Sequence, residues 1–400
     1  MKSWWRKLTD LDEYQLALAN LPIDKDQLVT GPPGSGKTNI LLLKALQTRR
    51  SGLAGIRVLV FTRTLREYIL RGGTEYALED KNTIVQTFDS FMVKLLLEHN
   101  ITPATANDMP ANLRFREQHN RRVRQCLEIA GRYADRFEAI FIDEGQDCSA
   151  EEVLLYRKLG KLCFVAADSK QSIYTGAAGL LEWKRSIGAE HQTHLQYHYR
   201  NGKAICLLAD LIARPSAGED KMLPSMRYDE EEAQSTVVPA NAVSLDEQIR
   251  KVIGLLQTQL KMYPNEMIGI ITPRQWILTQ ISQALKQSPY SDMCTFQKGA
   301  DEGTPYIEFS EGKRIFVCTV HSSKGLEAGA LHIVGAETFN EIPNLQTNLM
   351  YTGVTRAKTS LTIHHTGDLP PLLNDALRAI QGETRKVTLS DVFGVQDDVV

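Results

Sequence analysis

The sequence lacks the cysteine patterns of a zinc site or of a disulfide framework. Its six cysteines are scattered along 400 residues, with no CxxC pair and no Cys/His spacing typical of metal ligands. Most of them lie in apolar runs that resemble strands or helices. We therefore predict reduced core cysteines in a cytoplasmic protein.

Long apolar runs and charge of one sign are also missing. No run approaches the ~18 apolar residues of a membrane-spanning helix, and the N-terminal stretch MKSWWRKLTDLDEY does not resemble a secretory signal. We therefore expect no membrane partner. The net charge is −2, so there is no general basic excess. A nucleic-acid motor remains compatible with this charge, because it needs only a local basic stripe.

Short apolar runs alternate with helical patterns along most of the chain. This alternation is typical of parallel sheets covered by helices on both faces. It predicts an α/β protein with two domains, at 1–190 and 191–380, and a peripheral tail at 381–400. We interpret 216–235, which mixes Pro, Gly and acidic residues, as a surface loop. The predicted strands are 27–30, 56–62, 138–143, 161–168, 267–272, 314–320, 330–336 and 360–365.

A glycine-rich loop, GPPGSGKT, follows the first predicted strand and leads into the helical pattern TNILLLKALQTRR. This is the context of a phosphate-binding loop, whose backbone N–H groups and helix N-terminus favour phosphate. We expect Lys37 to reach the β- and γ-phosphates and the Thr38 hydroxyl to ligate Mg²⁺. The loop residues assigned to the nucleotide are Gly31, Gly34, Ser35, Gly36, Lys37 and Thr38.

The motif FIDEGQD (141–147) ends the predicted strand 138–143 with a cluster of acids. Phosphoryl transfer depends on positioning and charge neutralisation more than on covalent chemistry. We therefore assign Asp143 to the Mg²⁺ ion. Glu144 is placed to orient and deprotonate the attacking water.

Further motifs stand along the chain. They are LDEYQ (11–15) before the P-loop, FTRTLRE (61–67) and TFDSF (87–91) between the P-loop and DEGQD (143–147), and then ADSKQSIY (167–174), QYHYRNGKAI (196–205), TVHSSKGLE (319–327) and YTGVTRAK (351–358). All these motifs, in this order, resemble the UvrD/Rep-like branch of superfamily 1 DNA helicases over nearly the whole chain. The resemblance implies two RecA-like domains with parallel sheets, and a P-loop NTPase site for ATP and Mg²⁺ in the interdomain cleft. It also implies 3′→5′ translocation on single-stranded DNA.

The resemblance also implies roles for single residues. Gln15 would read adenine and Tyr199 would stack on it, while Gly325 approaches phosphate and Glu327 meets the ribose. Gln171 would sense the γ-phosphate, and two residues, Arg200 and Arg356, would act as arginine fingers. The nucleic-acid contacts implied are Thr62, Arg63, Thr87, Phe88, Tyr174 and His321.

The sequence departs from the family at three points. QSIY runs into TGAAG (175–179), so the usual base-stacking aromatic is missing. Tyr68, Phe88 or Trp183 could replace it, although a core position is the favoured interpretation for each. Asn39 stands where the family commonly has an arginine. TFDSF ends at residue 91 and FIDEGQD begins at 141, and IITPRQW (270–276) also lies close to FVCTVHSSKG. These intervals are too short for the large accessory subdomains.

The first of these intervals holds an arginine-rich segment, 113–137. As a helix it could grip phosphates, dock a partner or form a solvated face. Its arginines are Arg114, Arg116, Arg121, Arg122, Arg124, Arg132 and Arg136.

Two rival functions remain open beside the motor on single-stranded DNA. The first is an ATP-controlled binding subunit that recruits a partner, such as a nuclease or a repair or defence factor, without processive stepping. The second is a motor that acts on RNA. A self-contained nuclease is disfavoured, because no further carboxylate cluster occurs outside the ATP site.

Overall fold

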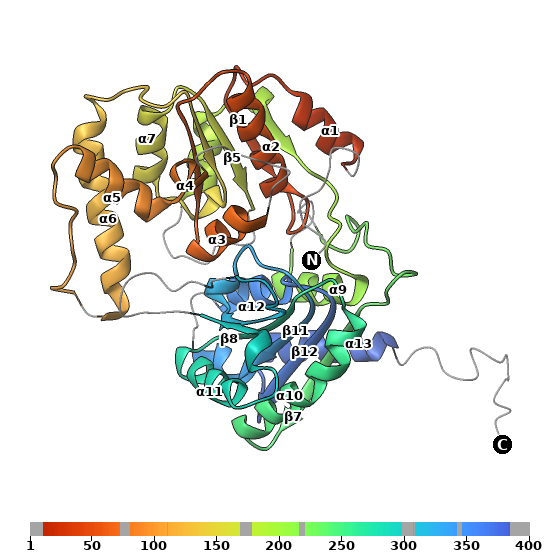
Figure 1. Ribbon diagram of the computed structural model, residues 1–400. Coiled ribbons are helices and arrows are strands. Elements are labelled where there is room, and N and C mark those ends of the chain that lie inside the picture. The colour runs from red at the N-terminus through yellow and green to blue at the C-terminus, as the bar shows by residue number, and fades with distance from the viewer. Residues whose placement is uncertain are drawn as a thin grey trace, which may run out of the picture.

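The computed structural model describes residues 11–72, 81–109, 111–168, 178–215, 221–297, 307, 309–341 and 346–384. The chain forms two six-stranded sheets, one after the other along the sequence (Figure 1). Every strand pair in both sheets is parallel. The predicted α/β class with two parallel sheets is confirmed.

The first sheet has the strand order β3-β2-β4-β5-β1-β6. Successive residues of a strand point to opposite faces. Val58 and Val60 accordingly pack with α1, α2 and α3, while Leu59 packs with the opposite layer of α5, α6, α7 and α8. The strands are β1 (Gln27–Thr30), β2 (Ile56–Val60), β3 (Val85–Thr87), β4 (Ala139–Ile142), β5 (Cys163–Ala167) and β6 (Gln192–His194). The helices are α1 (Glu13–Asn20), α2 (Lys37–Arg50), α3 (Arg63–Gly72), α4 (Lys81–Ile84), α5 (Phe88–Glu98), α6 (Ala111–Ala130), η2 (Gly145–Asp147), α7 (Ala150–Leu159), α8 (Gly179–Ser186) and η3 (Ala189–His191).

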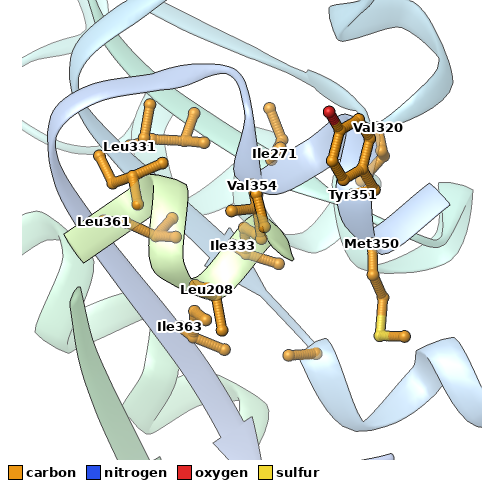
Figure 2. Close-up of a cluster of buried hydrophobic side chains, with 14 of the residues drawn as sticks. Leu208, Ile271, Val320, Leu331, Ile333, Met350, Tyr351, Val354, Leu361 and Ile363 are labelled. Atoms are coloured by element: carbon orange, nitrogen blue, oxygen red, sulfur yellow. The ribbon is translucent and has the colours of Figure 1, made fainter. Parts of the chain in front are cut away.

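The second sheet has the order β7-β12-β11-β8-β10-β9. Figure 2 shows one of its apolar layers, in which Ile333 and Ile363 of the sheet pack with Leu208 of α9 and Val354 of α12. The opposite layer packs against α10 and α11. The strands are β7 (Thr236–Ala242), β8 (Ile268–Thr272), β9 (Cys294–Phe296), β10 (Ile315–Thr319), β11 (Ala328–Val334) and β12 (Ala357–Thr366). The helices are α9 (Lys203–Ala213), α10 (Leu245–Met262), α11 (Gln275–Lys286), η4 (Ser291–Met293), η5 (His321–Ser323), η6 (Ala336–Glu341), α12 (Gln346–Val354) and α13 (Pro371–Thr384).

β6 pairs with β1 and completes the first sheet, so this sheet extends a few residues beyond the boundary that we predicted at residue 190. The chain passes to the second sheet only after His194. The predicted loop at 216–235 is turn-rich over its described part, 221–235. All six cysteines lie in the described residues, where each is buried and outside any disulfide. Among the described helices, none combines the length and the apolar character needed to cross a bilayer.

Candidate ATP site between the two sheets

The P-loop connects the end of β1 to α2. Gly34 and Gly36 have φ values of 76° and 87°, in the left-handed region that favours glycine. Both glycines also allow close approach: a Cβ on Gly34 would lie 2.5 Å from the Cβ of Arg200, and one on Gly36 would lie 2.7 Å from Gln15 Nε2. The loop is therefore enclosed by the helix that precedes it and by the chain that follows β6.

The Lys37 ammonium lies inside this loop. It donates hydrogen bonds to the carbonyls of Gly31 (2.7 Å) and Pro32 (2.8 Å), and it lies 3.7 Å from Asp168 Oδ2. Burial lowers the pKa of Lys37, and the charge of Asp168 opposes this shift. The Ser35 hydroxyl is buried without a hydrogen-bond partner in the described part of the chain. An ammonium, a free hydroxyl and the N-terminus of α2 form a cradle that fits a polyphosphate.

Two oxygen donors meet beside the cradle. Thr38 Oγ1 donates a hydrogen bond of 2.9 Å to Oδ2 of Asp143, which follows β4. Burial and the neighbouring Glu144 raise the pKa of Asp143 to about 7. The described residues hold no group of three or more His, Cys, Asp or Glu side chains that could cage a metal. A hydroxyl and one carboxylate fit Mg²⁺, which takes few protein ligands and completes its shell with phosphate and water.

Glu144 lies one residue further, in a left-handed conformation (φ 58°) at the start of η2. Burial opposes its charge, but Lys324 and Arg356 outweigh this effect and lower its pKa. Gln146 Nε2 donates to Glu144 Oε2 (2.5 Å), while Gln146 Oε1 accepts from the backbone N–H of Asp168 (2.8 Å). Glu144 is thus held as an oriented carboxylate, which is what a general base requires.

Lys324, a residue that we did not assign from the sequence, reaches this acidic group from the second domain. Its ammonium contacts the carboxylate of Asp147 and lies 3.4 Å from Glu144 Oε2 and 5.6 Å from the ring centre of Phe61. The Lys324 side chain is only 1% exposed. A sequence signal was available, since Lys324 directly precedes Gly325 in TVHSSKGLE.

The two arginines also approach the site from beyond β6. Arg200 Nε donates to Glu327 Oε2 (2.9 Å) while its side chain packs on Gly34. Arg356 is buried and donates to the carbonyls of Thr352 and Leu326. Burial and the charge of Arg200 lower the pKa of Arg356 to about 10, whereas Glu144 opposes the shift. The arginine charges therefore act on the same space as the acids of the first domain.

The residues expected to recognise the base lie together. Gln15 Nε2 donates to the Ser35 carbonyl (2.9 Å), and Tyr199 N donates to the Gly34 carbonyl (3.2 Å). The Tyr199 hydroxyl donates to the carboxylate of Asp12. Burial and this hydrogen bond raise the pKa of Tyr199 above its ordinary value.

Several residues expected to contact single-stranded DNA lie where the domains meet. Tyr174, from that group, and Gln171, which we expect to sense the γ-phosphate, fall outside the described residues. Thr62 Oγ1 accepts from the backbone N–H of Leu65 (3.0 Å) at the start of α3, which Arg63 begins. Gly325 lies against Leu65: a Cβ on it would be 3.1 Å from that side chain. His321 begins η5, and burial together with Lys324 lowers its pKa.

The other residues expected to contact single-stranded DNA, Thr87 and Phe88, are buried in the first domain. Thr87 is the buried N-cap of α5 and accepts from Ser90 N (3.2 Å). Phe88 is 3% exposed and packs with Phe61 and Tyr156 at ring-centre distances of 5.9 and 5.8 Å. As placed here, Phe88 is a core residue, which is the alternative that the sequence left open.

The same holds for Trp183, which is buried among the helices of the first domain, whereas the side chain of Tyr68 is outside the described set. Asn39, at the position of the family's arginine, is buried on α2. Its amide atoms have no hydrogen-bond partner among the described residues.

The arginine-rich segment lies in α6 as far as Ala130 and continues beyond its end, and several of its arginines are paired within the chain. On α6, Arg121 bonds both oxygens of Asp108 (2.8 Å each), and Arg122 bonds Asp89 at 2.7 Å. After α6, Arg136 bonds Glu98 at 2.6 Å. These contacts fasten the segment to its own domain and account for part of its charge without a nucleic acid.

Comparison with known proteins finds a family model that matches part of the second domain. Residues 314–364, which run from the start of β10 into β12, match the family model described as UvrD-like helicase C-terminal domain. This stretch of the second domain therefore resembles the C-terminal domain of UvrD-like helicases. The match includes Lys324, Glu327 and Arg356, so it covers the part of the second domain that faces the P-loop.

Two similar solved structures also carry helicase titles. One is the C-terminal domain of a possible DNA helicase from Lactobacillus plantarum WCFS1, with 20% identity over 46% of this chain and 96% of that chain, at a TM-score of 0.32. The other is the PRRSV helicase, with 15% identity over 90% of this chain and 58% of that chain, at a TM-score of 0.41. No curated protein matches the chain.

Proposed function

We propose that this protein is an ATP-dependent translocase and helicase that acts on single-stranded DNA in the 3′→5′ direction. It would work in the cytoplasm and need a protein partner for processive unwinding. One observation carries the proposal. Thr38, Asp143 and Glu144 of the first domain surround a phosphate cradle, and the cations of the second domain close over the same acids.

The residues divide the work of ATP hydrolysis. The P-loop backbone and Lys37 would bind the β- and γ-phosphates, and Thr38 with Asp143 would hold Mg²⁺. The bound ion would neutralise charge that develops on the phosphoryl oxygens. Glu144, a carboxylate kept in place by Gln146, would take the proton of the attacking water.

The second domain would complete the site at the transition state. Arg200 and Arg356 lie on the far side of the cleft, so their charges reach the phosphates only when the domains are closed. Hydrolysis would then remove contacts that hold the cleft shut. Opening and closing, combined with alternating grip on a strand that crosses both domains, would produce stepping.

ATP hydrolysis measured without polymer and with single-stranded DNA, duplex DNA and RNA tests the substrate. We expect the largest stimulation by single-stranded DNA; a larger stimulation by RNA would support the RNA motor. Direction is tested by displacement of streptavidin from biotin at either end of a strand. We expect displacement from the 5′ end only. Stimulated hydrolysis without displacement would instead support the ATP-controlled binding subunit.

Arg200→Ala and Arg356→Ala test the closed site. Each should lower kcat by roughly 10³–10⁵, the range attributed to arginine fingers, while nucleotide affinity changes far less. Arg185→Ala is the matched control, because Arg185 is an exposed arginine that pairs only locally with Glu182. Unchanged kcat in both cleft variants would disprove catalysis between the domains.

A further inference from the structure

Asp12 connects two elements that both border the nucleotide cradle. It is the N-cap of α1, where Oδ1 accepts a hydrogen bond of 2.7 Å from the backbone N–H of Gln15. Its other oxygen, Oδ2, accepts a hydrogen bond from the hydroxyl of Tyr199, 187 residues further along the chain. One carboxylate therefore bonds both Gln15 and Tyr199.

The Gln15 side chain is fixed in orientation by its own contacts. Its Oε1 accepts from the Asp12 backbone N–H (3.2 Å), and its Nε2 donates to the Ser35 carbonyl of the P-loop (2.9 Å). An amide has two donor hydrogens and two acceptor sites. These contacts leave one of each, so Gln15 can still bind a group that offers an acceptor next to a donor. The edge of adenine, with a ring nitrogen beside an amino group, has this pattern.

Tyr199 is fixed at two points as well. Its backbone N–H donates to the Gly34 carbonyl (3.2 Å), and its hydroxyl is bonded to Asp12. Tyr199 is only half-buried, which leaves part of the residue accessible to a flat partner. Arg200 is the next residue in the chain. The two contacts of Tyr199 therefore also hold the backbone that places the Arg200 side chain over Gly34.

We propose that Asp12 is a positioning residue for the nucleobase. It sets the Tyr199 ring at a fixed position relative to the Gln15 amide, so that a purine can meet the amide with its edge and the ring with its face. The preference for adenine over guanine then depends on this carboxylate, although Asp12 itself touches neither the base nor the phosphates. The inference rests on the proposed function, since it requires that the P-loop binds ATP.

The test separates the two jobs of Asp12. Asp12→Ser keeps the N-cap, because serine caps as well as aspartate, but it lacks the oxygen that meets Tyr199. Tyr199→Phe keeps the ring and loses only the hydroxyl. Binding of ATP, GTP and inorganic tripolyphosphate is measured by calorimetry for both variants and for the double variant. KM and kcat are measured alongside.

Each single variant should raise the Kd and KM for ATP about tenfold, the effect of losing one hydrogen bond to a charged group. The ratio of GTP to ATP affinity should rise in both variants, while the binding of tripolyphosphate by Asp12→Ser stays unchanged. The double variant should be no worse than either single variant, because both remove the same bond. Tyr197→Phe is the matched control, since Tyr197 is a neighbouring tyrosine that packs against Tyr14 instead.

Two results would overturn the inference. Unchanged ATP affinity in Asp12→Ser would show that the bond positions nothing, and an equal loss of tripolyphosphate binding would show a disturbed P-loop. In either case the proposed function remains intact as long as the wild-type protein binds tripolyphosphate and hydrolyses ATP. Failure of the wild-type protein to bind any of the three ligands would disprove the proposed function itself.

Discussion

At the residue scale, two partly buried charges of the candidate site, Lys37 and Glu144, differ in what they contact, so we expect their substitution to have different effects. Lys37→Ala should weaken nucleotide binding and turnover together, because the phosphates lose their ammonium partner. Glu144→Gln should keep binding but lower kcat by about 10²–10⁴, the usual contribution of a general base. Fluorescent-nucleotide binding and steady-state hydrolysis measure both. A Glu144→Gln variant with wild-type kcat would remove this residue as the base.

Lys324 forms a buried ion pair with Asp147 between the two domains. Lys324→Met should destabilise the protein by about 3–5 kcal/mol, because removal of one partner leaves a buried charge unpaired. Adding Asp147→Asn should recover part of the loss. Thermal unfolding measures both effects, and Lys184→Met is the control, since Lys184 is exposed on α8. An unchanged Tm in Lys324→Met would show that the pair adds no net stability.

The sequence predicted those residues of the proposed site that lie within short motifs. The P-loop (31–38) and DEGQD (143–147) are each one continuous stretch of sequence. In the structure, Thr38 of the first contacts Asp143 of the second, as the proposed Mg²⁺ site requires. Asp12 and Lys324 were missed because their partners lie 187 and 177 residues away along the chain. From its motif TFDSF, we assigned Phe88 to a contact with single-stranded DNA. An aromatic residue in an amphipathic helix can also fill the core, and Phe88 does so here.

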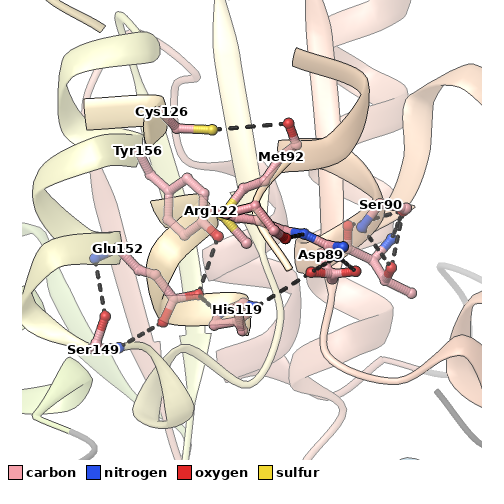
Figure 3. A network of polar contacts seen from close by, with 11 residues as sticks. Asp89, Ser90, Met92, His119, Arg122, Cys126, Ser149, Glu152 and Tyr156 are labelled. Carbon is pink, nitrogen blue, oxygen red and sulfur yellow. Dashed lines mark hydrogen bonds and ion pairs between the residues drawn. The ribbon is translucent and has the colours of Figure 1, made fainter. Parts of the chain in front are cut away.

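At the scale of elements, a charged cluster fastens α5, α6 and α7 to one another (Figure 3). His119 of α6 lies 2.9 Å from Glu152 of α7 and 3.8 Å from Asp89 of α5, which also pairs with Arg122. Burial opposes the charge on His119, but the bonds to Asp89 and Glu152 outweigh it and raise its pKa to about 9. The pKa values of both carboxyls are lowered by His119, against their own burial.

This cluster predicts a pH window of stability. His119 binds a proton more tightly in the folded state, so its contribution is complete below its unfolded pKa of ~6.5 and is lost as pH rises through about 9. The carboxylates of Asp89 and Glu152 stabilise the folded state above their ordinary pKa values, near pH 4. This stabilisation is lost as the pH falls below that range. Urea unfolding should therefore show His119→Gln less stable than wild type by about 3 kcal/mol near pH 6 and converging with it above pH 9. A difference that is constant with pH would contradict the charge assignment.

The strands that the sequence missed share a physical reason. β3, β6 and β9 have three residues each, and β3, β6, β7 and β9 are the edges of their sheets. Such strands need no continuous apolar run, and β7 contains Pro239, which is tolerated at an edge. The long apolar strands were found because they are covered on both faces. The helical arginines of α6 were also visible in the sequence, but their acidic partners on other elements were not.

At the scale of the whole molecule, the interface between the sheets combines a few direct bonds with the charges of the candidate ATP site. Ile307 N donates to Thr64 Oγ1 (3.1 Å), and Lys324 reaches Asp147 and Glu144 from the other side of the interface. Each contact connects a motif of the first domain, FTRTLRE or DEGQD, with the second domain. A change at the γ-phosphate would therefore alter the same interface that the proposed strand path crosses.

Separating a duplex requires a surface that holds the fork open, in addition to stepping along one strand. The interval between α5 and β4 is occupied by α6, which is fastened to its own domain by Asp89 and Asp108, so within the described residues no separate subdomain stands there to hold a fork open. Each base-pair step stores about 1.4 kcal/mol of stacking, and a motor without a separating surface slips back before the strands are apart. We expect strand-stimulated ATPase and movement on single strands, with poor unwinding of long duplexes by the isolated chain. Strand displacement on short and long duplexes with a 3′ tail, under single-turnover conditions, measures this. Processive unwinding of the long duplex by the purified monomer would contradict this expectation, and would mean that the arginine-rich segment 113–137 or the tail 381–400 supplies the separating surface.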